Sequence, residues 1–174
     1  AAALTDIEML GKDIFFDENL SVNKNQSCAA CHAPDVGWTG PDSLLNLHGA
    51  VYEGSIPSRF GNRKPPSSAY ATPSPILHLA KQGGGTFVGG NFWDGRATGE
   101  KLGNPAADQA QGPFLNPLEQ ALPDAACVVY RVFNSTYSGL YAQVWDSLPV
   151  INWPADIETV CGQDSGTVML TDED

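Results

Sequence analysis

The stretch Cys28-Ala29-Ala30-Cys31-His32 constrains this chain more than any other, because it has the pattern C-x-x-C-H. Two thiols at this spacing can each bond one vinyl group of the same porphyrin, which is how haem c is attached covalently. His32 follows directly, and one of its imidazole nitrogens can bind the iron. The motif therefore predicts one covalent haem c, held through Cys28 and Cys31 with His32 as axial ligand.

A redox-active C-x-x-C pair and half of a zinc site are the two alternatives for this motif. A redox pair needs no following histidine and usually lies in a βαβ pattern, which this sequence does not show. A four-ligand zinc site needs two more ligands, and only the isolated Cys127 and Cys161 remain. Haem attachment explains the cysteines and the histidine together, so we prefer it.

Haem c is attached outside the cytoplasm, so the motif predicts a periplasmic or extracellular protein. An oxidising compartment permits disulfides, and we predict one between Cys127 and Cys161, with thirty-three residues between them. The length of 174 residues favours a single domain. No apolar run approaches the length of a membrane-spanning helix.

The chain is strongly acidic, with nine Lys and Arg against twenty Asp and Glu and a net charge of −11. After Arg131 there is no Lys or Arg, while seven acidic residues follow. Nucleic acid and anionic membranes are poor partners for such a surface. The charge could steer a basic or dipolar electron-transfer partner, or could serve solubility alone.

The periodicity predicts a mainly α, cytochrome c-like haem domain with long Gly/Pro-rich loops. Helices are expected at residues 5–16, at the haem motif, and at 105–111, 123–133, 137–148 and 156–161. Thr5 and Glu8 have capping-box spacing, and Pro123 suits a first helical turn. The helix at 137–148 is expected to bury Leu140, Tyr141, Val144 and Trp145. Residues 34–75 are rich in turn formers and predict a long loop around the haem edge.

Four side chains are candidates for the sixth iron ligand. His48 lies in the Gly/Pro-rich loop and is slightly favoured over His78, which lies in an apolar segment. Met9, in the first helix, and Met169, in the acidic tail, are weaker candidates.

Several segments together resemble the bacterial dihaem cytochrome c peroxidases, over about residues 4–145. The matching stretches are Leu10–Asp17, Ser27–His32, Phe92–Ala97, Gln109–Pro113 and Asn116–Glu119. The Trp-Asp-Gly-Arg block at 93–96 is the most discriminating of these after the haem motif. The methylamine-dehydrogenase maturation enzymes share this architecture.

The resemblance implies that hydrogen peroxide is reduced at the haem of His32. A second domain with another C-x-x-C-H, or a haem-bearing subunit, would pass in electrons from a small cytochrome or cupredoxin. Trp93 would lie between the haems, as a packing or electron-relay residue. Gln109 and Glu119 would line the distal pocket, where a carboxylate can move a proton between peroxide oxygens.

Two further positions gain a role from the resemblance. Arg96 could bind a haem propionate, although pairing with Asp94 or capping a helix is an equal alternative. His48 occupies a loop position similar to that of a displaceable distal histidine in the family.

The chain departs from the family pattern in several ways. It has one C-x-x-C-H and about half the family's length. Lys64 stands where the family has an asparagine that helps to hold calcium, so calcium is not predicted. Residues 83–90 look like an insertion. The alternative function is a monohaem electron-transfer cytochrome, or a redox subunit without peroxidase turnover.

The chain is also expected to lack a carboxy-terminal helix and a second haem domain. Thr171 and the three acids after it look like the start of a helix, although a frayed tail is the alternative. In a cytochrome c-like fold the last helix packs across the first, and without it the face of Ile7, Leu10 and Ile14 would stay partly open.

Overall fold

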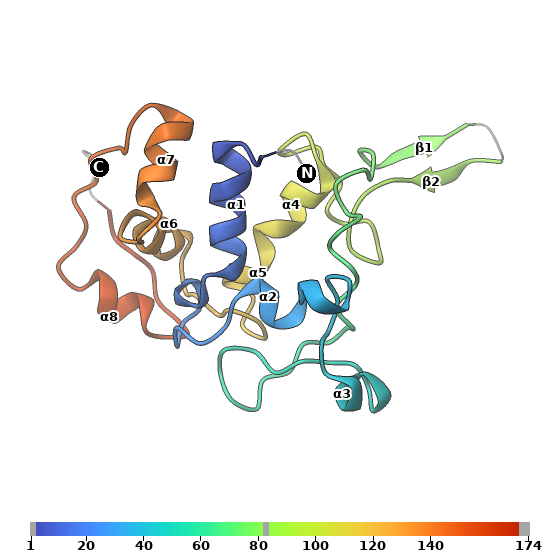
Figure 1. The fold of residues 1–174 in the computed structure, drawn as a ribbon, viewed down its shortest axis with the longest axis horizontal. Coiled ribbons are helices and arrows are strands. Elements are labelled where there is room, and N and C mark those ends of the chain that lie inside the picture. The colour runs from blue at the N-terminus through green and yellow to red at the C-terminus, as the bar shows by residue number, and fades with distance from the viewer. Residues whose placement is uncertain (1–2, 82–83, 171–174) are drawn as a thin grey trace.

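The computed structural model describes residues 3–81 and 84–170 and is helix-rich with one small sheet, in agreement with the predicted fold class (Figure 1). The helices are α1 Asp6–Phe16, α2 Cys28–Cys31, α3 Ser43–Leu47, α4 Pro105–Ala110, α5 Gly112–Leu115, α6 Ala125–Phe133, α7 Ser138–Trp145 and α8 Ile157–Cys161. Two short 3-10 turns lie at Glu18–Leu20 and Pro34–Val36, and two strands lie at β1 His78–Ala80 and β2 Thr86–Val88. No helix in the described ranges is long and apolar enough to cross a membrane.

Helix α1 begins as its sequence predicts, with the Thr5 backbone N–H donating to Glu8 Oε2 at 2.8 Å. The helix packs against α7, which lies beside it (Figure 1). Within α1, Leu10 is buried to 3% exposure, while Ile7 stays 57% exposed. Helix α7 therefore packs on α1, while the expected carboxy-terminal helix stays a prediction. The predicted helix start at Thr171 lies outside the described residues.

Helices α6 and α7 differ from their predicted limits. The Asp124 side chain accepts the Ala126 N–H at 2.9 Å and caps α6, so Pro123 precedes the helix instead of forming its first turn. Trp145 was expected to be buried but is 51% exposed. Helix α7 ends there because Asp146 turns the chain with φ of 61°, and the indole packs against Tyr141, with ring centroids 4.4 Å apart.

The buried core lies around a disulfide. Cys127 and Cys161 are bonded, as predicted, and both are fully buried. The bond joins α6 to α8 inside a cluster whose other members are Leu122, Ile157 and Val168. The disulfide therefore ties the carboxy-terminal segment to the helical core.

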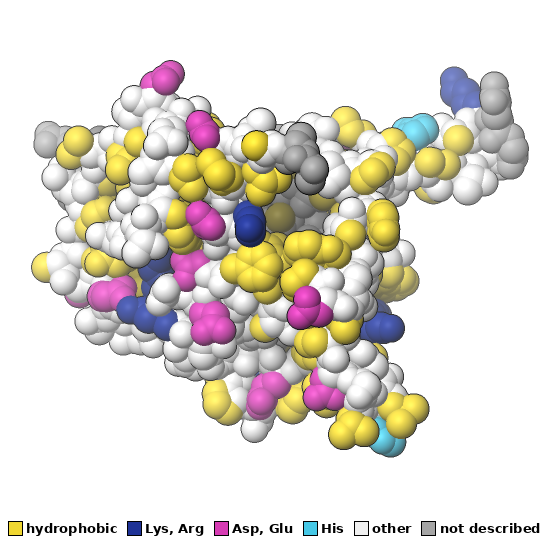
Figure 2. Space-filling model, in the orientation of Figure 1, with side chains coloured by type: hydrophobic (Ala, Val, Ile, Leu, Met, Phe, Trp, Pro, Cys, Tyr) yellow, Lys and Arg dark blue, Asp and Glu magenta, His cyan; other side chains and the backbone are white. Residues whose placement is uncertain are grey.

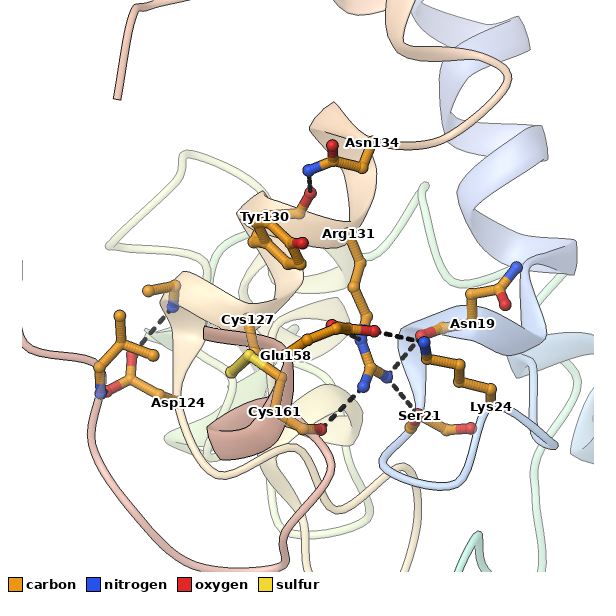
Figure 3. The surroundings of a disulfide bond; sticks show 12 residues. Asn19, Ser21, Lys24, Asp124, Cys127, Tyr130, Arg131, Asn134, Glu158 and Cys161 are labelled. Carbon is orange, nitrogen blue, oxygen red and sulfur yellow. Dashed lines mark hydrogen bonds and ion pairs between the residues drawn. A yellow bond between two sulfur atoms is a disulfide. The ribbon is translucent and has the colours of Figure 1, made fainter. Parts of the chain in front are cut away.

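Arg131 connects this core to the segment that leads into the haem motif (Figure 3). Its side chain is buried and donates to the carbonyls of Asn19 at 2.7 Å, Ser21, and Cys161 at 2.8 Å. Burial lowers its pKa, and the Glu158 carboxylate, 4.0 Å from its Nε, opposes that shift. One guanidinium thus fixes three chain segments that are distant in sequence.

Strands β1 and β2 form an antiparallel hairpin that projects from the body of the molecule (Figure 1). The sequence did not predict it, because the residues after β1 are mostly glycines. Two of them are required at its base. Gly89 has φ of +92°, and a Cβ there would lie 2.2 Å from the Pro75 carbonyl oxygen. The Gly90 N–H donates to that same oxygen at 2.9 Å, which closes the base.

Candidate haem site

The attachment residues occupy a single helical turn. Helix α2 spans Cys28–Cys31, and the His32 N–H closes it by donating to the Cys28 carbonyl at 3.0 Å. Both thiols are free and half-buried, whereas the other two cysteines form the disulfide. The turn presents two sulfurs and one imidazole from adjacent positions, as covalent haem attachment requires.

The imidazole of His32 is oriented by two backbone carbonyls. Its Nδ1 lies 2.9 Å from the Pro66 oxygen and 3.2 Å from the Trp38 oxygen. Carbonyl oxygens only accept, so Nδ1 carries the proton and Nε2 keeps its lone pair. Metal-binding histidines commonly donate their other N–H in this way, which fixes the tautomer and the ring plane.

The two carbonyls are themselves held by a strap of loop. The Thr39 hydroxyl donates to the Pro65 carbonyl at 2.6 Å, and the Ser67 hydroxyl donates to the Gly37 carbonyl at 2.7 Å. The Ser68 N–H donates to the Trp38 carbonyl at 3.0 Å. Residues 65–68 are therefore fixed against residues 37–39. We call residues 65–68 the strap. The long Gly/Pro-rich loop thus has a role, because its residues Trp38 and Pro66 supply the carbonyls that orient the His32 imidazole.

Glu119 is brought to the motif by backbone contacts between distant segments. The Ser55 N–H donates to the Glu119 carbonyl at 2.7 Å, and the Val22 N–H donates to the Gln120 carbonyl at 2.8 Å. Gly54 permits this approach, since a Cβ there would lie 2.4 Å from the Leu118 carbonyl oxygen. The segment before the motif, residues 53–55 and residues 118–120 therefore form one unit.

The Glu119 carboxyl is half-buried and acts electrostatically on the motif. Burial raises its pKa, while the Asn116 amide, which donates to Oε1 at 2.7 Å, and the charge of Arg96 lower it. Its own charge helps to raise the pKa of both Cys28 and Cys31. The Glu119 carboxyl is therefore within electrostatic range of both attachment thiols.

Burial keeps both attachment thiols protonated. It raises the pKa of Cys28 to about 11, with Glu119 adding to the effect. Burial also raises the pKa of Cys31, opposed by the Gln26 amide, whose nitrogen lies 3.5 Å from Sγ. Reactive redox cysteines have a lowered pKa. The thiols here therefore lack the electrostatics of a redox C-x-x-C pair.

The remaining predicted pocket residues lie in different settings. Gln109 is half-buried in the last turn of α4. Trp93 is 74% exposed, with the Arg63 guanidinium 5.0 Å from its ring centroid. Arg96 makes a two-pronged ion pair with Asp94, at 2.9 and 3.0 Å, and stacks on the Phe92 ring at 3.6 Å. The structure thus shows the Asp94 partnership that the sequence left open.

The candidate sixth ligands lie at separate edges of the fold. His48 caps the end of α3 and is exposed, and His78 begins β1 with Nδ1 2.8 Å from the Ile76 carbonyl oxygen. Helix α3 and the hairpin are separate projections (Figure 1). Met9 is half-buried in α1, and Met169 is 76% exposed.

The residues present fit a haem c. Cys28 and Cys31 supply the two sulfurs, and His32 supplies an oriented Nε2 with its lone pair free. Hydrophobic side chains gather on the face between α1 and the hairpin, over α2 (Figure 2). A porphyrin needs such an apolar surface beside its ligand set.

Comparison with known proteins identifies the family. Residues 5–162 match the family model for di-haem cytochrome c peroxidase. This chain belongs to the di-haem cytochrome c peroxidase family. It is 40% identical over 124 residues to the methylamine utilization protein MauG of Paracoccus denitrificans, and 31% identical over 113 residues to the cytochrome c peroxidase Ccp of Escherichia coli.

Solved structures agree with this assignment. The diheme peroxidase BthA of Burkholderia thailandensis superposes with a TM-score of 0.70 and 27% identity over 94% of this chain. The chain spans only part of these relatives, 30% of the MauG protein, 18% of Ccp and 38% of BthA. The family resemblance seen in the sequence is confirmed, and these relatives are much longer than this chain.

Sequence reasoning missed the residues that position the site. Pro66 and Trp38 act through backbone carbonyls, which carry no side-chain signal. Gln26 and Asn116 contact Cys31 and Glu119 through their side-chain amides. Asn116 precedes Glu119 by three positions, a separation typical of turns closed by a side chain, and this spacing could have drawn attention to it.

Proposed function

We propose that this chain is the peroxidatic haem domain of a larger peroxidase, and that it reduces hydrogen peroxide to water with electrons from a redox partner. One observation carries the proposal. Glu119 is a half-buried carboxyl with a raised pKa, and its charge helps to raise the pKa of Cys28 and Cys31. A proton-handling group beside an iron ligand is what peroxide reduction needs.

The haem, when bound, supplies the iron that binds peroxide and delivers electrons to it. Reduction of peroxide to two waters also consumes two protons, and these are the task of the protein. The raised pKa lets Glu119 carry a proton at a higher pH than an ordinary glutamate. Asn116 holds Oε1 at 2.7 Å, which leaves Oε2 to give up and take back that proton.

Other residues prepare the site without exchanging protons. The carbonyls of Pro66 and Trp38 hold Nδ1 of His32, so that Nε2 points in one direction. Gln109 is proposed to orient peroxide beside Glu119. Trp93 is proposed to pack between haems or relay electrons, and Arg96 to bind a propionate in exchange for Asp94.

The whole protein is proposed to contain more than residues 1–174. A second haem domain or haem-bearing subunit would receive electrons from a small cytochrome or cupredoxin and pass them to this haem. We propose a periplasmic or extracellular location, which the Cys127–Cys161 disulfide supports, since structural disulfides persist in oxidising compartments. His48 and His78 remain the proposed sixth ligands.

The test compares Glu119→Gln with Glu100→Gln in the haem-loaded, full-length protein. Loss of a positioned acid–base group typically lowers turnover by about a hundredfold to ten-thousandfold. We expect such a loss in kcat for Glu119→Gln, with carbon monoxide binding to the reduced protein retained. Glu100 is exposed and distant from the motif in sequence, so its variant should behave as wild type.

Spectroscopy of the wild type separates the proposal from its alternative. A haem that stays low-spin, binds no carbon monoxide and consumes no peroxide would contradict the peroxidase function. That result would instead identify an electron-transfer cytochrome or a redox subunit.

A further inference from the structure

Residues 54–93 contain no Asp or Glu, although the whole chain has twenty. The same stretch carries four of the nine Lys and Arg residues, namely Arg59, Arg63, Lys64 and Lys81. The net charge of −11 thus hides a positive segment within a strongly acidic protein. We call its described part, residues 54–81 and 84–93, the acid-free lobe.

Three of the four basic side chains in the acid-free lobe are exposed, namely those of Arg63, Lys64 and Lys81. Arg59 alone pairs with a carboxylate, that of Asp164 at 2.5 Å. Within the described ranges, no acidic side chain lies at ion-pair distance from the other three. Figure 2 shows acidic side chains over the body of the molecule and none on the projecting hairpin.

The acid-free lobe also presents apolar side chains. Leu79 and Phe87 are paired across the hairpin, so both side chains lie on one face. They are 52% and 70% exposed. Ile76, at the base of the hairpin, is 44% exposed. An aromatic and two aliphatic side chains beside the exposed Lys81 resemble an interface with an apolar centre and a charged rim.

The hairpin is mounted firmly enough to act as a preformed surface. The Ser74 hydroxyl donates to the Gly90 carbonyl at 2.7 Å, and the Gly90 N–H donates to the Pro75 carbonyl. Asn91 forms a bridge with Ala97 immediately after the base. A surface fixed before binding loses little conformational entropy when a partner docks.

We propose that the acid-free lobe docks an acidic protein, with Leu79 and Phe87 at the centre of the contact and Lys81 at its rim. The exposed bases steer an acidic surface, and the apolar pair holds it. An anionic membrane is disfavoured, because an extended anionic surface would also meet the acidic body of this protein, whereas a small protein can contact the projecting hairpin alone. The proposal concerns binding alone and does not depend on peroxidase turnover.

The test measures binding of the full-length protein to a small acidic ferredoxin, by calorimetry at low ionic strength. We expect Lys81→Glu and Phe87→Ser each to raise the dissociation constant by about tenfold or more, as loss of a rim charge or an aromatic anchor does. Lys12→Glu on α1 makes the same change in net charge outside the acid-free lobe and should leave binding within about twofold. The effect of Lys81→Glu should shrink in about 0.5 M salt, where charges are screened.

Three results would overturn the proposal. These are absence of ferredoxin binding at low salt, equal effects of Lys81→Glu and Lys12→Glu, and Lys81-dependent binding to phosphatidylglycerol vesicles without binding to ferredoxin. Sedimentation of the protein alone completes the test. Self-association abolished by Phe87→Ser would assign the surface to a second copy of the chain and would also overturn the proposal.

Discussion

The disulfide side and the haem-motif side of this molecule are built differently. The disulfide side consists of α6, α8 and a buried cluster around Cys127 and Cys161, closed by the guanidinium of Arg131. The motif side consists mostly of loops joined by single backbone hydrogen bonds, such as those of the 65–68 strap. The comparison indicates that one side is stabilised by its own side chains, and it predicts that the other side gains its apolar contacts from a bound haem.

The largest expected effect comes from preventing haem attachment. In a Cys28→Ser, Cys31→Ser variant, we expect amides of residues 33–39 and 65–68 to lose at least about tenfold in hydrogen-exchange protection. Amides of α6 and α8 should keep their protection, since the disulfide is untouched. Equal loss on both sides would show that the two sides fold as one unit.

Arg131→Met should give the largest loss of stability from a single substitution on the disulfide side. It removes the buried donors to the carbonyls of Asn19, Ser21 and Cys161. Breaking a buried charged network costs about 3–5 kcal/mol. Denaturant unfolding measures the loss. The Arg131→Lys variant keeps the positive charge but loses the several N–H donors of the guanidinium, so its stability should lie between those of the wild type and Arg131→Met. A change below about 0.5 kcal/mol, the range of ordinary surface substitutions, would contradict the linking role of Arg131.

Removal of the disulfide should cost slightly less. The cysteines are 34 positions apart, and closing such a loop contributes about 3–4 kcal/mol. A Cys127→Ser, Cys161→Ser variant should unfold at lower denaturant concentration but retain its bound haem. Haem loss in this variant would show that the motif side relies on the disulfide side.

Gly54→Ala tests how the motif side positions Glu119. The new Cβ would lie 2.4 Å from the Leu118 carbonyl oxygen, so the backbone of residues 118–119 would have to shift. Overpacking of this kind costs about 1–3 kcal/mol. Gly11→Ala is the matched control, because nothing lies near its Cβ in α1, and it should stabilise by about 0.5–1 kcal/mol. Equal stability of the two variants in denaturant would disprove the close approach.

The smallest effect concerns the pH dependence of stability. Burial raises the folded-state pKa of Glu119 above its ordinary 4.5, so the folded protein binds this proton more tightly than the unfolded chain. Glu119 therefore favours folding most below pH 4.5, and this contribution is lost as pH rises through the raised value. The wild type should lose stability relative to Glu119→Gln over that interval. If the wild type instead gained stability relative to Glu119→Gln over this pH interval, the folded-state pKa of Glu119 would be lowered and not raised.

The sequence predicted the local features of both sides well. C-x-x-C-H marks the attachment turn, and Thr5 with Glu8 marks the start of α1, because these signals depend on neighbouring residues. The disulfide was also predicted, since only two other cysteines remain. The hairpin was missed because its residues include many glycines, and the packing of α7 on α1 could not be read from either helix alone.

The parts of the site that sequence could not predict depend on long-range backbone contacts. Residues 118–120 lie against residues 53–55 because the Ser55 N–H binds the Glu119 carbonyl and Gly54 leaves room for Leu118. His32 is oriented by a carbonyl 34 positions away. Neither contact has a periodic or side-chain signature, so the structure was needed to find them.

The most direct test of the central claim is the mass of one tryptic peptide. Cleavage after Lys24 and Arg59 releases residues 25–59, which contain Cys28, Cys31 and His32. The account predicts that this peptide carries the mass of one haem after denaturation and extraction with acidified butanone. A peptide of unmodified mass, with both thiols open to alkylation, would contradict it.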